Sequence, residues 1–141
     1  MTAESGCRVI DDTYNANPLS VSAAIDVLAE MQSDAAVKTI LVLGDMAELG
    51  QSAERLHAEI GEKAKVAGVT ALYATGTLSV KTVKAFGENG YHFQSKEKLI
   101  DTLIGDLTGS EVVLVKGSRS AAMEEVVEQI LTHDNKSKRV N

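Results

Sequence analysis

The segment Thr39-Ile40-Leu41-Val42-Leu43 runs directly into Gly44-Asp45-Met46-Ala47-Glu48-Leu49-Gly50. Its first five residues are β-branched or aliphatic without interruption, which is typical of a strand covered on both faces. The next seven form a loop that contains glycine and acidic side chains. Val112-Val113-Leu114-Val115, followed by Lys116-Gly117-Ser118-Arg119-Ser120, repeats this arrangement later in the chain. Two buried strands that each end in a polar loop predict a parallel sheet with helices on both faces.

Five short strands are expected to alternate with five helices. The predicted strands are rich in β-branched and aromatic residues and occupy residues 8–10, 39–43, 71–74, 91–93 and 112–115. The helical segments carry apolar stripes, of which the clearest consists of Met123, Val126, Val127, Ile130 and Leu131. This strict alternation predicts a Rossmann-like, three-layer α/β domain with a mainly parallel sheet and right-handed crossovers.

Single residues indicate where several helices should begin. Asn17 precedes Pro18, a combination that suits an N-cap followed by the first helical position. Ser52, Thr77 and Ser95 stand where the N-caps of the second, third and fourth helices are expected. The loop after the fifth strand is expected to lead directly into the last helix.

The chain of 141 residues is long enough for one compact domain. We expect this domain to span residues 1–131 and to be followed by a polar tail, residues 132–141. A net charge of −6 offers no general attraction to nucleic acid or anionic lipid. The single cysteine, Cys7, excludes an internal disulfide, and no apolar run approaches the ~18–20 residues of a membrane span. These features predict a cytoplasmic protein.

Ligands of open α/β sheets bind outside the carboxyl ends of the strands, so the loops there carry the candidate site residues. The first loop is Asp11-Asp12-Thr13-Tyr14-Asn15-Ala16-Asn17-Pro18. Its carboxylates suit a ribose hydroxyl or a magnesium-bound water, and its amides suit a polar ligand. The alternative is a local role, in which Asn17 caps a helix and Asp12 makes a turn.

The loop of residues 116–120 is a second candidate. Its lysine, its arginine and its two serines at the start of a helix suit an anion such as a carboxylate or a phosphate. The alternative is an ordinary serine cap flanked by solvated cations. In the loop after the second strand, Asp45 and Glu48 suit an ammonium group, or else form a solvated turn.

Several common motifs are missing from the sequence. No two glycines are spaced as G-x-G and no Gly-Lys pair occurs, so the dinucleotide fingerprint and the P-loop are both absent. His57, His92 and His133 are scattered, and we assign no metal site built by the protein. His57 lies beside the apolar stripe of the second helix, which indicates a packing role. A nucleotide bound here would need its phosphates held by other means.

Three segments together resemble signatures of the Mur ligases: residues 11–18, 43–50 and 115–124. They occur in the family's order, each at the end of a predicted strand, and the resemblance extends from about Val9 to Leu131. Within the family, they are most similar to the branch that adds D-Ala-D-Ala to a UDP-MurNAc-tripeptide. The resemblance implies that this chain is the C-terminal, Rossmann-like domain, without the N-terminal UDP-sugar domain and the central ATPase domain.

The resemblance also implies an ATP-dependent ligase of peptidoglycan synthesis, with consequences for cell wall biogenesis, cell shape and cell division. ATP with Mg²⁺, bound mainly by the central domain, would convert the tripeptide carboxylate into an acyl phosphate, which the amine of D-Ala-D-Ala attacks. The C-terminal domain would close over the central one and present this amine, excluding water from the intermediate. The chain alone is expected to be inactive.

Individual roles follow from the same resemblance. Asp12 matches the acid near the ATP ribose and phosphates and is the candidate catalytic residue. Asp12, Tyr14, Asn15 and Asn17 are the candidate nucleotide-binding residues. The candidate substrate-binding residues are Asp45, Met46, Lys116, Ser118, Arg119 and Ser120. Arg119 or Lys116 is expected to bind the carboxylate of the dipeptide.

Two other interpretations compete with this one. A phosphoacceptor receiver domain also has an acid pair after its first strand, and Asp45 and Lys116 imitate its later residues. However, Asp45 follows the second predicted strand, whereas the acceptor of a receiver follows the third, and Gly117 stands where a receiver has proline. A folylpolyglutamate- or cyanophycin-type ligase domain shares the architecture but not the run Tyr14-Asn15-Ala16-Asn17-Pro18.

Overall fold

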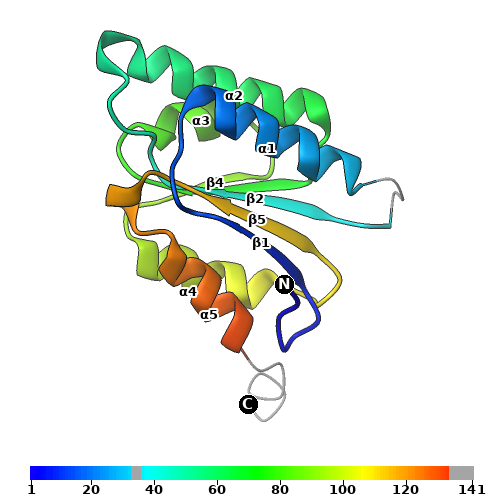
Figure 1. Ribbon diagram of the computed structural model, residues 1–141. Helices are drawn as coiled ribbons and strands as arrows, with labels where there is room; N and C mark the ends of the chain where they lie inside the picture. Colours follow the sequence, from blue (N-terminus) through cyan, green and yellow to red (C-terminus); the bar gives the residue numbers. More distant parts are fainter. Residues whose placement is uncertain (33–35, 134–141) are drawn as a thin grey trace.

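The computed structural model describes residues 1–32 and 36–133, which form three layers (Figure 1). Along the chain, strands and helices alternate in the order β1 (Arg8–Asp12), α1 (Pro18–Glu30), β2 (Thr39–Leu43), α2 (Ala53–Ala67), β3 (Ala71–Thr75), α3 (Ser79–Phe86), β4 (Gly90–Phe93), α4 (Lys96–Asp106), β5 (Val112–Lys116) and α5 (Glu124–Thr132). The predicted alternation is confirmed. Residues 134–141, most of the predicted polar tail, lie outside the described residues.

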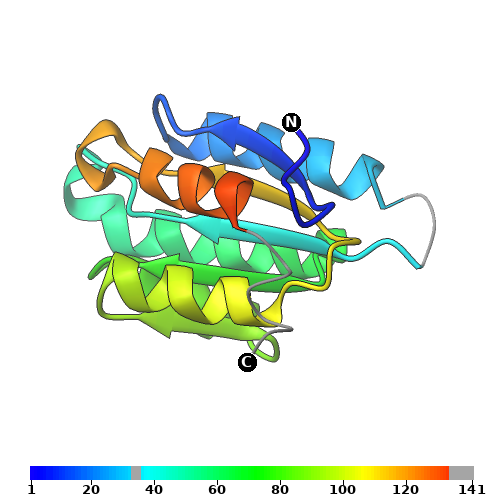
Figure 2. The ribbon, with the colours of Figure 1, turned by 90° about the horizontal axis from the view of Figure 1, so that it is seen from below.

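The strands form one parallel sheet in the order β1-β5-β2-β3-β4. Helices α1, α2 and α3 cover one face, while α4 and α5 lie side by side on the other (Figure 2). The Rossmann-like three-layer fold is therefore confirmed. The last strand, β5, lies between β1 and β2, because the crossover through α4 returns across the opposite face of the sheet from α1, α2 and α3.

Two apolar cores lie between the sheet and its two helix layers. Alternate residues of a strand point to opposite faces, so β5 supplies Val113 and Val115 to one core and Val112 and Leu114 to the other. Gly61 of α2 permits close packing against α3, because a Cβ atom there would lie 2.1 Å from the carbonyl oxygen of Thr82. This packing joins α2 and α3 within the helix layer on that face of the sheet.

Two of the predicted N-caps are observed in the structure, and the others differ from the prediction. Asn17 and Ser95 each accept a hydrogen bond from the backbone N–H three residues on, as their N-cap assignment predicts. Ser52 precedes α2 but makes no side-chain capping bond. The prediction for Thr77 was wrong, because α3 begins at Ser79 and a carboxylate from another loop caps it.

The start of the last helix also differs from the prediction. A 3₁₀ turn, Arg119–Ala121, follows β5, and Ala122 then adopts a left-handed conformation with φ of 51° before α5 begins at Glu124. Lys116 ends β5 and Arg119 lies in the 3₁₀ turn, so neither cation stands in the first turn of α5, which carries Glu124 and Glu125 instead. The prediction that these cations and the N-terminus of α5 form one anion site is therefore wrong.

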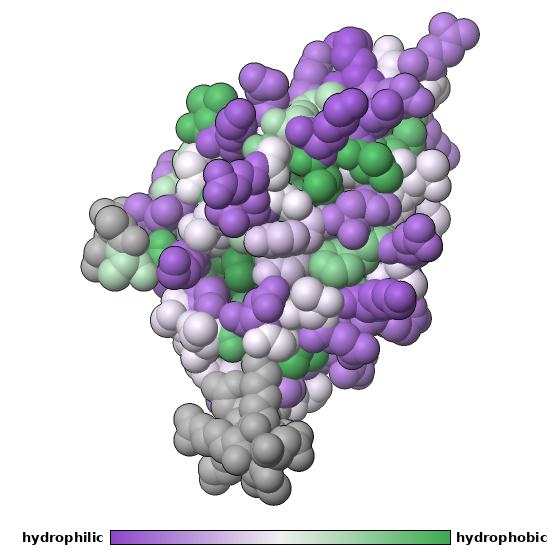
Figure 3. Space-filling view, turned by 180° about the vertical axis from the view of Figure 1, so that it is seen from behind, coloured by the Kyte–Doolittle hydropathy of each residue, from purple (hydrophilic) through white to green (hydrophobic). Residues whose placement is uncertain are grey.

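On the side opposite the view of Figure 1, hydrophilic residues predominate and hydrophobic residues lie in small groups among them (Figure 3). Among residues 1–32 and 36–133, no helix combines the length and apolar character needed to cross a bilayer. The large apolar side chains lie mainly in the two cores.

Candidate functional site

The candidate site lies at the carboxyl edge of the sheet, on both sides of β5. The chain leaves β1 and β2 toward the helix layer of α1 and α2, whereas it leaves β5 toward the opposite layer (Figure 1). Neighbouring parallel strands whose connections diverge in this way leave a crevice between them. β5 has such a neighbour on each side, so the fold provides two crevices, which we call the β1 hollow and the β2 hollow.

The β1 hollow has a volume of about 520 Å³ and is lined by Asp11, Thr13, Tyr14, Arg119 and Glu124. Tyr14 is 76% exposed, and the guanidinium carbon of Arg119 lies 5.3 Å from the centroid of its ring. This distance is within the range of a cation–π contact. The hollow thus offers an exposed aromatic face, one cation and several oxygen atoms, a combination that can bind a planar ring and polar groups attached to it.

The β2 hollow, about 310 Å³, lies between the loops after β2, β3 and β5. It is lined by Asp45, Thr75, Gly76, Lys96, Ser118, Ser120 and Ala121. The backbone N–H of Ser118 donates to the carbonyl oxygen of Asp45 over 3.2 Å, and the hydroxyls of Ser118 and Ser120 lie 3.0 Å apart. These contacts join the second and fifth loops and place hydroxyl groups on one wall of a small cavity whose lining is otherwise mainly apolar.

Between the two hollows, Lys116 links the first loop to β5. The pairing register sets Lys116 beside Asp12 on one side and beside Leu43 on the other. Lys116 is 1% exposed, and its ammonium group lies 3.1 Å from Oδ2 of Asp12 and donates to the carbonyl oxygen of Asn15 over 2.8 Å. A lysine is almost never fully buried unless it is paired. Its partners come from the end of β1 and from the loop that follows.

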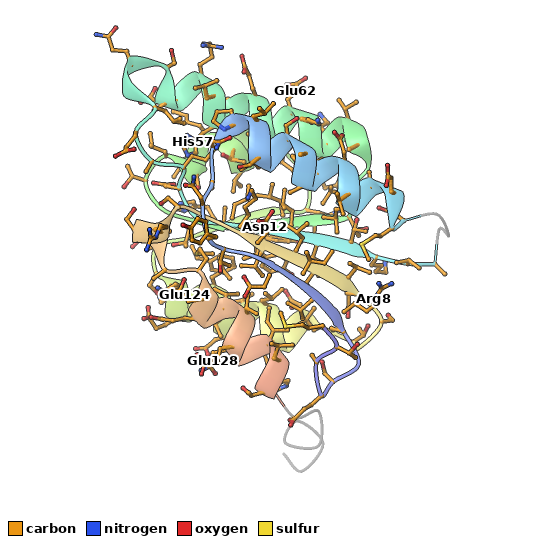
Figure 4. The ribbon with its side chains drawn as sticks, viewed as in Figure 1. Arg8, Asp12, His57, Glu62, Glu124 and Glu128 are labelled. Carbon is orange, nitrogen blue, oxygen red and sulfur yellow. The ribbon has the colours of Figure 1, made fainter. Side chains whose placement is uncertain are left out.

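The carboxylate of Asp12 pairs with Lys116 and is also accessible to solvent, since the Asp12 side chain is 46% exposed. Figure 4 shows Asp12 and Arg8 toward opposite ends of β1, with Asp12 on the side where the strand-end loops gather. Asn17 uses its side chain in a capping box with Ser20, as the local alternative predicts. The amide oxygen of Asn15 accepts from the backbone N–H of Ala16.

The loop after β2 is held by contacts that the sequence did not indicate. Both carboxylate oxygens of Asp45 accept backbone N–H groups at the start of α3, from Leu78 over 3.1 Å and from Ser79 over 2.9 Å. Met46 is buried among the apolar residues around α1 and α2, so its side chain points away from the β2 hollow. His57 is 2% exposed and bridges two backbone groups, because Nε2 accepts from the N–H of Met46 and Nδ1 lies 2.7 Å from a carbonyl oxygen of α2. Its predicted packing role is confirmed.

The structure therefore divides the predicted site residues into groups. Tyr14 and Arg119 border the β1 hollow, and Asp45, Ser118 and Ser120 border the β2 hollow. Lys116 and Asp12 lie between them, whereas Met46 is part of the core. The serine and arginine side chains after β5 thus alternate between the two hollows.

Other lining residues were missed by sequence reasoning. Asp11, Thr13 and Glu124 belong to the segments that were singled out, but were assigned no role. Lys96 follows the short loop after β4, in which no motif was recognised, and its place beside the β2 hollow depends on the tertiary fold. No local pattern in the sequence indicates this position.

Ionisable groups with shifted pKa values lie away from the two hollows. Burial raises the pKa of the Cys7 thiol, and burial together with its hydrogen bond to Asp106 raises the pKa of Tyr73. Burial alone would raise the pKa of Glu111, but hydrogen bonds donated by Thr108 and Gly109 outweigh it and lower this pKa. No three His, Cys, Asp or Glu side chains are grouped to hold a metal ion in the described ranges 1–32 and 36–133.

The family described as Mur ligase, glutamate ligase domain, matches residues 1–119. The chain belongs to the Mur ligase family. The matched region includes all five strands of this Mur ligase domain and most of both hollows, since Ser120, Ala121 and Glu124 are the lining residues beyond it.

Curated relatives point to one branch of the family. The domain is 46% identical over 123 residues to the UDP-N-acetylmuramoyl-tripeptide–D-alanyl-D-alanine ligase of Escherichia coli strain K12, covering 84% of this chain and 26% of the relative. It is 30% identical to the ligase of the same name from Bacillus subtilis strain 168, covering 91% of this chain and 29% of the relative. The chain thus spans less than a third of the length of these relatives.

Solved structures agree with this assignment. MurF from Acinetobacter baumannii superposes with a TM-score of 0.81 at 29% identity, over 93% of this chain and 29% of that one. The MurF ligase from Thermotoga maritima in complex with ADP superposes with a TM-score of 0.75 at 27% identity, over 89% of this chain and 28% of that one. The receiver interpretation is not supported, because the chain belongs to the Mur ligase family and the carboxylate of Asp45 caps α3.

Proposed function

We propose that this domain forms part of an ATP-dependent ligase that joins D-Ala-D-Ala to a UDP-MurNAc-tripeptide in peptidoglycan synthesis. The observation that carries the proposal is the pair of hollows beside β5, each bounded in part by segments that resemble the family signatures, within a domain that belongs to the family. In the reaction, the dipeptide amine attacks the acyl carbon of the phosphorylated tripeptide. The C–N bond forms, the C–O bond between the acyl carbon and the phosphate breaks, inorganic phosphate leaves, and the amine nitrogen loses a proton. We place this activity in the cytoplasm, where ATP is supplied.

The β1 hollow is proposed as the part of the nucleotide site that this domain contributes. Its exposed Tyr14 ring and the Arg119 guanidinium suit a base or ribose and a nearby phosphate. Asp12, which lies between the two hollows beside Lys116, would act on the ribose and phosphate region. A Mg²⁺ ion would need ligands from outside the described residues, such as the phosphates themselves, because this domain groups no three suitable side chains.

The β2 hollow is proposed as the site of the dipeptide. Hydroxyls of Ser118 and Ser120 can donate to its carboxylate, and the walls leave room for two small methyl side chains. Asp45 lies nearby, but both of its carboxylate oxygens already accept backbone N–H groups at the start of α3. Asp45 therefore holds the cavity wall in place, and its carboxylate has fewer free acceptor positions for an ammonium group. Asp45 and Met46 were predicted to bind the substrate. We propose instead that both residues support the walls of the site.

The test is a phosphate-release assay with a complete ligase that contains this domain. We expect release of inorganic phosphate that requires ATP, UDP-MurNAc-tripeptide and D-Ala-D-Ala together, with a product heavier by the dipeptide minus water. L-Glutamate in place of the dipeptide serves as the control for a folylpolyglutamate-type activity. Release with glutamate but not with D-Ala-D-Ala would overturn the proposal.

A further inference from the structure

The turn that carries Ser120 is unusually constrained. We call residues 118–122 the β5 turn. Within it, the N–H of Ala121 donates to the carbonyl oxygen of Ser118 over 3.0 Å. Ala122 has a φ of 51°, a left-handed conformation that costs an alanine energy and persists where the surroundings enforce it. Something outside the turn must therefore hold it in place.

Lys96 supplies such a restraint from a distant part of the chain. It is the first residue of α4, on the side of the sheet that also carries α5. Its ammonium group donates to the carbonyl oxygens of Ala121 over 3.3 Å and of Ala122 over 3.1 Å. It also lies 3.4 Å from Oε2 of Glu125 in the first turn of α5, with its side chain only 18% exposed. One cation thus joins α4, the β5 turn and α5.

The number of partners indicates how Lys96 acts. A lysine ammonium has three N–H donors, and three acceptor groups from the protein surround it here. Lys96 lines the β2 hollow, but its donors are already engaged by the wall of that hollow. A direct role in binding a ligand carboxylate would require it to abandon these contacts.

We infer that Lys96 is a positioning residue for the β2 hollow, holding the β5 turn so that the Ser120 hydroxyl stands where the dipeptide binds. This inference rests on the proposed function, because it assumes that the ligand of the β2 hollow is D-Ala-D-Ala. Lys96 also donates to the carbonyl oxygen of Ala122. The same contact therefore helps to maintain the left-handed conformation of that residue, on which the shape of the β5 turn depends.

Steady-state kinetics of the complete ligase test this inference. We expect Lys96→Met to raise the KM for D-Ala-D-Ala roughly ten-fold or more, since small displacements of positioning groups have effects of this size. The KM for ATP should rise less than the KM for D-Ala-D-Ala, because Lys96 binds the carbonyl oxygens of Ala121 and Ala122, which follow Ser120, whereas Arg119 lies nearer to β5 in the turn. Lys96→Arg keeps cationic donors and should restore most of the affinity. Lys98→Met removes an exposed lysine of the same helix and is the matched control.

A purely structural role would give a different result. Loss of folded enzyme lowers the apparent kcat equally for all substrates and leaves each KM unchanged. An unchanged KM for D-Ala-D-Ala in an active Lys96→Met enzyme would therefore overturn the inference while the proposed function stands. If the unmodified enzyme shows no phosphate release that depends on D-Ala-D-Ala, the proposed function itself fails, and the inference fails with it.

A second measurement covers the case in which Lys96→Met is too unstable for kinetics. Lys96→Gln retains two N–H donors but no charge, so it should weaken the restraint with less loss of stability. Amide hydrogen exchange of the 141-residue chain should be faster at Ala121 and Ala122 in this variant than in the Lys98→Met control. Equal exchange rates at these two positions would overturn the inference.

Discussion

Lys116 shows how a single side chain sets the local electrostatics of the site. Its ammonium group is buried beneath the loops, and its countercharge is the half-exposed carboxylate of Asp12. An ammonium that loses such a partner stays buried with less compensation, which is costly. Asp12 therefore has a structural task in addition to its proposed role beside the nucleotide.

For Asp12→Asn, we expect the free energy of unfolding of the 141-residue chain to fall by about 1–3 kcal/mol. The amide keeps an oxygen near Lys116 but removes the charge. Urea titration measures the effect, with Asp11→Asn as the control, because Asp11 is exposed and its contacts with Thr13 need only an acceptor oxygen. Equal stability of the two variants would show that the ion pair contributes little. In the complete ligase, Asp12→Asn should also reduce turnover.

Arg119 gives a prediction about which ligand each hollow serves. Its guanidinium lies by Tyr14 in the β1 hollow, whereas sequence reasoning assigned it to the dipeptide carboxylate. We now expect Arg119→Ala to raise the KM for ATP about ten-fold, the effect of losing one charge-assisted hydrogen bond, and to change the KM for D-Ala-D-Ala less. Steady-state kinetics with each substrate varied in turn checks this. A larger effect on the dipeptide would restore the original assignment.

At the scale of elements, α3 depends on a carboxylate that belongs to another part of the chain. Asp45 follows β2, yet it accepts the first backbone N–H groups of α3 and a hydroxyl hydrogen bond from Ser79. Negative charge at the N-terminus of a helix is favourable because of the helix dipole. Gly76 makes room for the contact, since a Cβ atom there would lie 2.3 Å from Oδ1 of Asp45.

Removal of this cap should destabilise the domain. We expect Asp45→Ala to lower the free energy of unfolding by about 1–2 kcal/mol, the usual cost of losing an N-cap, and Asp45→Asn to lower it less, because one acceptor oxygen remains. Urea titration of the 141-residue chain measures both, with Glu48→Gln in the same loop as the control. If Asp45→Ala were as stable as that control, the carboxylate would be a solvated group without a capping role.

The elements themselves could be predicted because their signals are local. The uninterrupted apolar run Thr39–Leu43 and the Asn17-Pro18 pair each specify their structure within a few residues. The position of β5 between β1 and β2 could not be predicted in this way, since it depends on which strands pair across the whole chain. The same is true of Lys96, whose partners lie 25 and more residues away in sequence. The loops were found, but the division of their side chains between two hollows required the fold.

At the scale of the whole molecule, the two open hollows would let the domain contact each proposed ligand from one side only. The sequence has no P-loop, so the phosphates of ATP would meet few donors here. We expect calorimetry of the 141-residue chain to give a Kd for ATP of about 1 mM or weaker, and no ligase activity. A micromolar Kd would contradict this expectation and would mean that the β1 hollow is a complete nucleotide site.

The stability of the whole domain in acid should depend on Glu111. The pKa of its carboxyl is lower in the folded state than the ordinary value of 4.5, so it stabilises the fold fully above that value. This contribution is lost as the pH falls through the lower, folded-state pKa. We expect Glu111→Gln to be less stable than the parent at pH 7, and the difference to narrow in acid. Thermal unfolding from pH 7 to pH 3 measures both; a constant difference would contradict the prediction.

The position of β5 also has a consequence for synthesis on the ribosome. Translation produces β1 first and β5 last, yet β5 is the strand that joins β1 to the rest of the sheet. Until residues 112–116 emerge, the nascent chain holds β1 apart from β2, β3 and β4, with unpaired strand edges that invite aggregation. Pairing Arg8 with Val112 closes a long loop, which slows folding. The sheet is therefore expected to complete in one late step, after nearly the whole domain has left the exit tunnel.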